Sequence, residues 1–142
     1  AYTGPPAPFP MLDPASPSDI VIININPLER HTLPKTPQQI QNRINEIGFN
    51  TSLLRELRAI DFVQRLLDDG KMERGEMARV FVHMVADDDL MNDLSVATKL
   101  VPTPYILDKL KKAGRRAASA FLTSDKAKLG KESTVDLREM FQ

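Results

Sequence analysis

The sequence contains hydroxyl, carboxylate and imidazole groups, but their spacing matches no motif for nucleophilic catalysis. None of the serines stands in a G-x-S-x-G segment, in which a sharp strand-to-helix turn would expose the hydroxyl. The glycines form neither G-x-G-x-x-G nor a Walker sequence, so a phosphate-binding loop is not indicated. Paired carboxylates such as Asp68 and Asp69 stand at an expected helix end, where water would solvate both. On its own residues the chain is not a credible enzyme.

Metal binding is not indicated either. The two histidines, His31 and His83, are far apart in the sequence, and without cysteine they specify no zinc motif. Three adjacent carboxylates, Asp87-Asp88-Asp89, are of the type that binds calcium or magnesium. The segment lacks EF-hand spacing, however, and the helix dipole alone favours acids at a helix start. We therefore expect no metal and no cofactor.

Two segments predict β-strands. The run from Asp19 to Pro27 is mostly β-branched and apolar without alternation, which is typical of a strand covered on both faces in a parallel sheet. A second strand is predicted from Ala78 to Val85. Two strands joined by helix make a crossover unit, so the predicted fold class is α/β, mainly helical, with a parallel-type sheet. Because a buried strand needs neighbours on both sides, we expect a part of a larger sheet.

The end of the first strand supplies the candidate site residues. In parallel α/β sheets the carboxyl ends of the strands face the ligand crevice. Asn24 and Asn26 close the strand, and Arg30 and His31 follow in the loop. We expect these four side chains to line a substrate crevice. The alternative is a satisfied polar turn with a surface histidine.

A long helical region starts at Thr36-Pro37-Gln38-Gln39, which has the pattern of a capping box, and continues to Asp69. Its apolar residues form two stripes on opposite faces, which meet at Gly48. The first stripe holds Ile40, Ile44 and Ile47, and the second holds Phe49, Leu53, Leu57, Ile60, Val63 and Leu67. This change of face predicts two helices or one sharply broken helix.

A further helix is predicted from Thr103 to Leu122, with its basic residues on the outside. The stripe expected to be buried holds Ile106, Leu107, Leu110, Ala113, Ala117 and Phe121.

The composition limits the possible partners and the possible compartment of the protein. Nineteen basic and nineteen acidic residues cancel, so there is no net field to attract nucleic acid. The lack of cysteine fits a reducing compartment, and no segment approaches the roughly 20 apolar residues that cross a bilayer. The amino end also lacks a secretory signal pattern. We predict a cytoplasmic protein, and the absence of an initiator methionine suggests an upstream portion.

Several segments resemble the carboxy-terminal half of bacterial patatin-like phospholipases, in the branch with a C-terminal extension of unknown function. The most distinctive are R-I-N-E-I-x-F-N, from Arg43 to Asn50, and L-R-E-L-R-A-I, from Leu54 to Ile60. Ala1-Tyr2-Thr3-Gly4 and the strand from Asp19 to Pro27, which runs into Leu28-Glu29-Arg30, also match. The resemblance implies a three-layer α/β/α fold and a serine lipid acyl hydrolase with a Ser–Asp dyad.

The resemblance also implies where the chain lies in such a protein. Ala1 matches the last position of the D-G-G/A motif, so the catalytic aspartate would lie just before this chain and the serine far upstream. Residues 1–35, a Pro-rich segment plus the strand, would complete the catalytic domain, and residues 36–142 would form a helical extension with one further strand. One departure is Gly4-Pro5-Pro6, where such proteins often have asparagine before the proline.

The expected function is therefore a non-catalytic scaffold in a serine lipid acyl hydrolase. Its partners would be the upstream catalytic half and a lipid or acyl ester substrate, and a chain without that half would associate with itself. The alternative is a helical interaction module that binds a protein partner or an anionic membrane surface. In that case the basic residues Lys111, Lys112, Arg115 and Arg116 would carry the contact.

Overall fold

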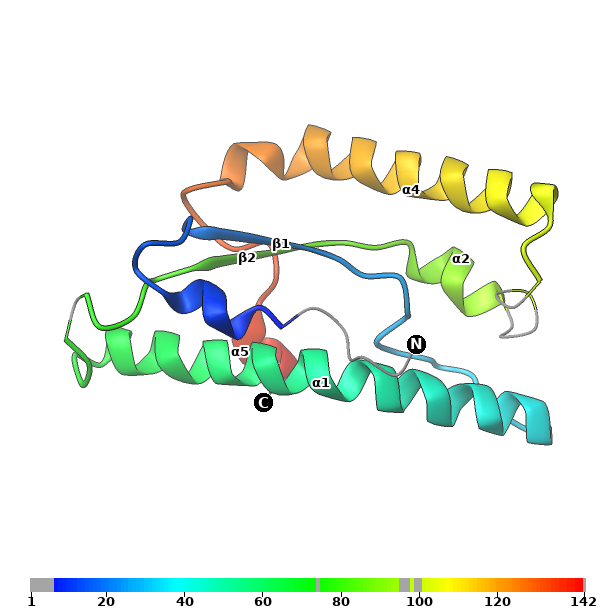
Figure 1. Cartoon of the computed structure of the whole chain (residues 1–142), viewed down its shortest axis with the longest axis horizontal. Coiled ribbons are helices and arrows are strands. Elements are labelled where there is room, and N and C mark those ends of the chain that lie inside the picture. The colour runs from blue at the N-terminus through cyan, green and yellow to red at the C-terminus, as the bar shows by residue number, and fades with distance from the viewer. Residues whose placement is uncertain (1–6, 74, 95–97, 99–100, 142) are drawn as a thin grey trace. The chain divides into compact units, whose positions relative to one another are not determined.

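The computed structural model describes residues 7–73, 75–94, 98 and 101–141. Its strands are β1 (Asp19–Ile23) and β2 (Phe81–Val85), and its α-helices are α1 (Pro37–Asp68), α2 (Asp88–Asp93), α4 (Pro104–Ser124) and α5 (Leu137–Met140). Short 3-10 turns cover Phe9–Leu12 and Lys126–Lys128. The chain is α/β and mainly helical, with a two-stranded parallel sheet, as predicted (Figure 1). The segment from Ala1 to Gly4 lies outside the described residues.

The pairing of β1 with β2 fixes which way each residue of β1 faces. Phe81 N–H donates to Ser18 O at 2.7 Å, and Asn24 N–H donates to Val85 O at 2.9 Å. In a parallel strand the N–H and C=O of one residue point to the same side, and successive residues alternate. The backbone of Ile20 and Ile22 therefore faces β2, and that of Val21 and Ile23 faces the opposite edge.

Both strands are shorter than predicted. β1 ends at Ile23 rather than Pro27, because Asn24 turns its side-chain amide to Asn26 O at 2.7 Å. β2 begins at Phe81 rather than Ala78, because Ala78 N–H donates to Leu12 O at 2.7 Å and so leaves the line of the strand. The ladder itself continues one residue past Ile23, since Asn24 N–H still donates to Val85 O.

The chain forms two compact units, each made from separated segments. The first contains residues 1–22, 51–84 and 127–142, and the second contains residues 23–50 and 85–126. The predicted division at residue 35 stays a prediction.

The core of the first unit lies between one face of the sheet and the second half of α1. Its buried residues are Leu12, Ile20, Ile22, Leu53, Leu57, Ile60, Val63, Val80, Val82 and Leu137. Of the predicted second stripe, Leu53, Leu57, Ile60 and Val63 are buried and Leu67 packs against them, whereas Phe49 is 36% exposed. The expectation that β1 is covered on both faces is wrong in the described chain, since Val21 is 47% and Ile23 73% exposed. One helix layer covers one face, so the burial alternates along the strand.

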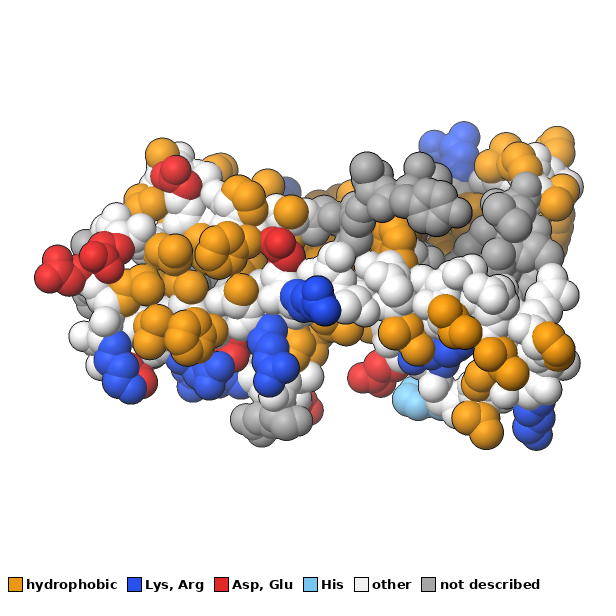
Figure 2. Space-filling model, turned by 60° about the horizontal axis from the view of Figure 1, so that its bottom comes forward, with side chains coloured by type: hydrophobic (Ala, Val, Ile, Leu, Met, Phe, Trp, Pro, Cys, Tyr) orange, Lys and Arg blue, Asp and Glu red, His pale blue; other side chains and the backbone are white. Residues whose placement is uncertain are grey.

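α1 runs through Gly48 as one uninterrupted helix, so the predicted break is wrong. The break was expected because two opposite stripes would both need burial. In fact Ile40, Ile44 and Ile47 are 45%, 56% and 52% exposed. Because this first stripe is not buried, the helix does not have to break to bury both stripes. Glycine inside a helix costs only about 1 kcal/mol relative to alanine, so Gly48 alone does not end it. Figure 2 shows hydrophobic side chains on the face that α1 presents.

The second unit has a smaller core between α2 and α4. Leu90, Leu94 and Ala113 are buried, with Met91 and Leu110 packed against them. Both helix starts are capped as their sequences predict, by Asp87 Oδ1 accepting from Leu90 N–H and by Thr103 Oγ1 accepting from Ile106 N–H. One residue of the predicted stripe is wrong. Leu107 is 53% exposed because it lies roughly 120° around the helix from Ala113.

A polar junction in the first unit joins β1, β2 and the C-terminal segment. His83 is fully buried, and its Nε2 lies 3.0 Å from Asp19 Oδ1. The same oxygen accepts from Gly130 N–H at 2.7 Å. The Gly130 bond, assisted by His83 and Ser18, holds the pKa of Asp19 below its ordinary value. Gly130 has φ +71°, a left-handed conformation that favours glycine.

Replacing Asp19 by alanine tests this junction. We expect Asp19→Ala to lower the free energy of unfolding by about 1 to 3 kcal/mol, because it removes the acceptor for the Gly130 amide and for a buried imidazole. The measurement is urea denaturation at neutral pH. Asp108→Ala is the matched control, because Asp108 only joins Lys112 in an exposed ion pair, and it should change the value by less than about 0.5 kcal/mol.

The same carboxylate predicts a pH dependence. A pKa below the ordinary value of 3.8 means that the stabilisation by Asp19 is complete above that value and is lost as the pH falls through the lower native pKa. The stability of the wild type should therefore fall more steeply below about pH 4 than that of Asp19→Ala. Urea denaturation across this range measures both curves. Parallel curves would contradict the assignment.

Candidate functional site

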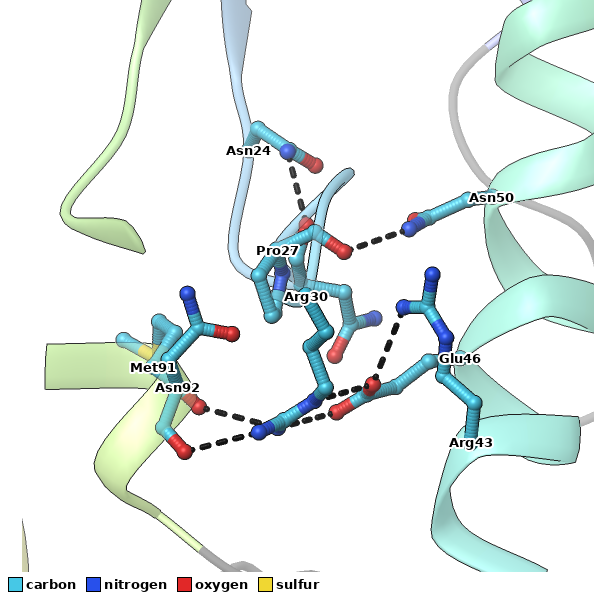
Figure 3. Close-up of polar contacts among 9 residues, drawn as sticks. Asn24, Pro27, Arg30, Arg43, Glu46, Asn50, Met91 and Asn92 are labelled. Carbon is cyan, nitrogen blue, oxygen red and sulfur yellow. Dashed lines mark hydrogen bonds and ion pairs between the residues drawn. The ribbon is translucent and has the colours of Figure 1, made fainter. Parts of the chain in front are cut away.

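The loop that follows β1 is fixed by buried amide side chains of the second unit (Figure 3). Asn24 is 7% exposed and donates through Nδ2 to Asn26 O at 2.7 Å. Asn50 of α1 is 4% exposed and donates through Nδ2 to Pro27 O at 2.8 Å. These bonds satisfy backbone carbonyls that the end of the strand leaves without partners. The loop is held at both of these points.

Arg30 is the most highly connected side chain of this region. Its Nε and Nη2 donate to the two carboxylate oxygens of Glu46 at 2.8 and 2.7 Å, which is a bidentate pair. Its Nη1 donates to Asn92 O at 2.8 Å, and Nη2 lies 3.5 Å from Met91 O. These carbonyls belong to the last turn of α2, where the helix dipole favours a cation. The Glu46 contact raises the pKa of Arg30, so the guanidinium stays charged.

Glu46 is the buried partner of this pair. Its side chain is 4% exposed, and it also has Arg43 Nη1 at 3.6 Å from Oε2, one turn earlier on α1. A carboxylate removed from water is costly unless it is paired and hydrogen-bonded, and Arg30 supplies both conditions. The cluster of Arg30, Arg43 and Glu46 therefore joins the loop, α1 and α2 within the second unit.

A cavity of about 190 Å³ lies beside this cluster. Its polar wall includes Arg30, Thr32, Gln39, Asn42 and Arg43. Pockets for drug-sized ligands measure roughly 300 to 1,000 Å³, so this space is small for a lipid chain. The expectation that Asn24, Asn26, Arg30 and His31 line a substrate crevice stays a prediction.

The four predicted site residues divide into distinct roles. Asn24 and Asn26 shape the loop, Arg30 is saturated by Glu46 and α2, and His31 is exposed outside the cavity wall. The structure brings the first three together as a loop support. Sequence reasoning missed Glu46 and Asn50 as their partners. Glu46 and Asn50 are four residues apart in the R-I-N-E-I-x-F-N segment, so their polar side chains lie on the same face of the helix. This spacing could have indicated a polar contact.

Two described serine hydroxyls contact the carboxylate of the next residue: Ser18 Oγ donates to Asp19 Oδ2 at 3.2 Å, and Ser124 Oγ donates to Asp125 Oδ2 at 2.9 Å. His83 contacts Asp19, but with no exposed surface it has no access to a substrate. Ser133 Oγ accepts from Val82 N–H at 3.0 Å and serves the sheet edge. Across the described positions, no group of three or more His, Asp or Glu side chains is placed to hold a metal ion.

Comparisons of the chain with protein-family models, with curated proteins and with solved structures found no match. The resemblance to patatin-like phospholipases therefore stays a prediction. Of the helices described, none is both long enough and apolar enough to cross a membrane.

Substitution of Arg30 distinguishes loop support from ligand binding. We expect Arg30→Ala to lower the free energy of unfolding by about 3 kcal/mol, because it leaves Glu46 buried without its bidentate partner. Arg30→Lys should recover only part of this loss, because an ammonium group does not reproduce the paired geometry. Chemical denaturation measures all variants.

Arg43→Gln is the control for Arg30, because Arg43 lies on the same carboxylate at a longer 3.6 Å. It should cost less than about 1 kcal/mol. If Arg30→Ala unfolded no more easily than Arg43→Gln, Arg30 would be free for a ligand and the structural role would be wrong.

Proposed function

We propose that the chain is a non-catalytic scaffold that completes the sheet of a larger α/β protein. The observation that supports this most is the difference between the two edges of the described sheet. At β2, Val82 N–H donates to Ser133 Oγ at 3.0 Å, and Val82 O accepts from Thr134 and Val135 N–H at 3.0 and 3.2 Å. At β1, the outward backbone of Val21 and Ile23 has no neighbouring strand in the part of the chain that is described.

The side chains of β1 support the same proposal. Val21 and Ile23 of β1, and Ile25 just beyond its end, are apolar and β-branched, and they are 47%, 73% and 59% exposed. An apolar strand with an unpaired edge is a template for a further strand. A neighbouring strand would cover the edge, and a second layer of helix would cover the exposed face. The result would be the three-layer α/β/α arrangement that a parallel sheet requires.

The resemblance suggests which protein supplies those layers. In this proposal the partner is the upstream catalytic half of a patatin-like serine lipid acyl hydrolase, which cleaves carboxylic esters of lipids with a Ser–Asp dyad. The serine would attack the ester carbonyl while the aspartate accepts its proton, and the ester C–O bond would break as the alcohol leaves with that proton. Water would then hydrolyse the acyl-serine to release the carboxylic acid and restore the serine. The present chain supplies support, because the fixed loop from Asn24 to Arg30 follows the carboxyl end of β1, where α/β proteins bind ligands.

Labelling with a fluorescent fluorophosphonate tests the hydrolase part of this proposal. We expect the protein isolated from its source to carry label on a polypeptide that contains or accompanies this sequence, because fluorophosphonates react with activated serines. The 142-residue chain expressed alone should stay unlabelled. Label on that chain would overturn the non-catalytic role, and an unlabelled native preparation would overturn the hydrolase assignment.

Ile23→Lys tests the completion of the sheet. In the 142-residue chain the change should alter the free energy of unfolding by less than about 0.5 kcal/mol, because the side chain is exposed. With the proposed catalytic half supplied as a separate polypeptide, it should lower the recovery of that half with this chain more than about tenfold, because a buried lysine without a partner is costly. Leu33→Lys is the matched control, since Leu33 is 76% exposed and lies outside β1. Equal recovery of both variants would contradict sheet completion.

A further inference from the structure

The outward face of α4 combines cations with exposed apolar side chains. At 100° per residue, Leu107, Lys111, Arg115 and Leu122 fall within about 100° of one another, and Lys112 and Tyr105 extend this arc on one side. The buried and half-buried residues Ile106, Leu110, Ala113, Ala117 and Phe121 lie on the opposite side. The outward face is therefore distinct from the face that packs in the second unit.

Charge on this face is only partly neutralised. Lys112 Nζ lies 2.7 Å from Asp108 Oδ2, and Arg116 Nη2 lies 3.4 Å from Asp87 Oδ2. Lys111 and Arg115 have no ion pair with any described residue. Asp108 is the one acidic residue in α4, which also holds five basic residues. The outward face itself holds three of these cations, Lys111, Lys112 and Arg115, and the one carboxylate of Asp108, so it is net positive although the chain as a whole has no net charge.

Apolar residues decide which kind of anionic partner this face fits. Tyr105, Leu107 and Leu122 are 73%, 53% and 57% exposed and lie among the cations rather than opposite them. A nucleic acid would satisfy the cations, but it offers little to the leucines. A lipid surface satisfies both groups, since its headgroups attract Lys and Arg and its interface accepts Leu and Tyr side chains.

We propose that the outward face of α4 binds the surface of a bilayer that contains anionic lipids. Lys111, Lys112 and Arg115 contact the headgroups, and Leu107 and Leu122 enter the interface beside them. This binding is peripheral and does not depend on the proposed hydrolase role, because all of the residues belong to α4.

Vesicle sedimentation tests the proposal with the full 142-residue chain. We expect binding to vesicles of phosphatidylcholine and phosphatidylserine in about equal parts, and at least about tenfold weaker binding to phosphatidylcholine alone. The triple variant Lys111→Gln, Lys112→Gln, Arg115→Gln should lower the partition coefficient on anionic vesicles about a hundredfold, since each cation near such a surface contributes about fivefold. Added salt should weaken the binding of the wild type.

Two further variants test whether vesicle binding depends on this face rather than on the net charge of the chain, and whether it differs from the binding of a simple polyanion. Arg55→Gln, Arg58→Gln, Lys131→Gln removes three exposed cations from other elements, and it should keep at least a third of the wild-type partition coefficient. Leu107→Ser, Leu122→Ser keeps every cation, and it should bind vesicles about tenfold more weakly while its retention on heparin is unchanged.

Four results would overturn the proposal. They are no binding of the wild type to anionic vesicles, equal binding to neutral vesicles, an equal loss in both triple variants, and vesicle binding by the leucine variant that matches the wild type. The last result would assign the face to a polyanion such as nucleic acid or an acidic protein.

Discussion

The parallel pairing of β1 with β2 requires the chain to return from the carboxyl end of one strand to the beginning of the next, and α1 makes most of that return. The pairing also sets the direction of every residue of β1. Ile20 and Ile22 turn their side chains to the core of the first unit, and Val21 and Ile23 turn theirs to solvent. The core, the exposed face and the unpaired edge in the described residues all follow from this register.

Polar contacts hold the ends of this arrangement. Asp19 accepts from Gly130 and contacts the buried His83, which fixes the beginning of β1 in the first unit. In the second unit, Arg30 and Glu46 fix the loop that follows β1. The first is a hydrogen bond between a carboxylate and a buried imidazole, and the second is an ion pair with a buried carboxylate. Breaking either leaves a buried group without its partner in a low-dielectric site. The Arg30–Glu46 pair explains why Arg30, one of the four polar candidates of this loop, has a structural role.

Local signals in the sequence predicted local structure well. The caps at Thr36 and Thr103 and the core stripe from Leu53 to Val63 depend on neighbours within one or two helical turns. The misses depend on distant residues. The continuity of α1 at Gly48 could not be predicted because it depends on whether Ile44 is buried, and the role of Arg30 depends on Glu46, sixteen residues away. Both faces of β1 were expected to be covered, but the periodicity of its sequence alone does not show which element covers each face.

The central claim, that β1 is an interior strand of a larger sheet, is tested most directly by amide hydrogen exchange along β1. In the 142-residue chain, the amides of Ile20 and Ile22 should exchange slowly, because they face β2, and those of Val21 and Ile23 should exchange fast. In a protein that contains the proposed catalytic half, all four should exchange slowly. Fast exchange at Val21 and Ile23 in that complete protein would contradict the claim, because their edge would then face water in the functional assembly.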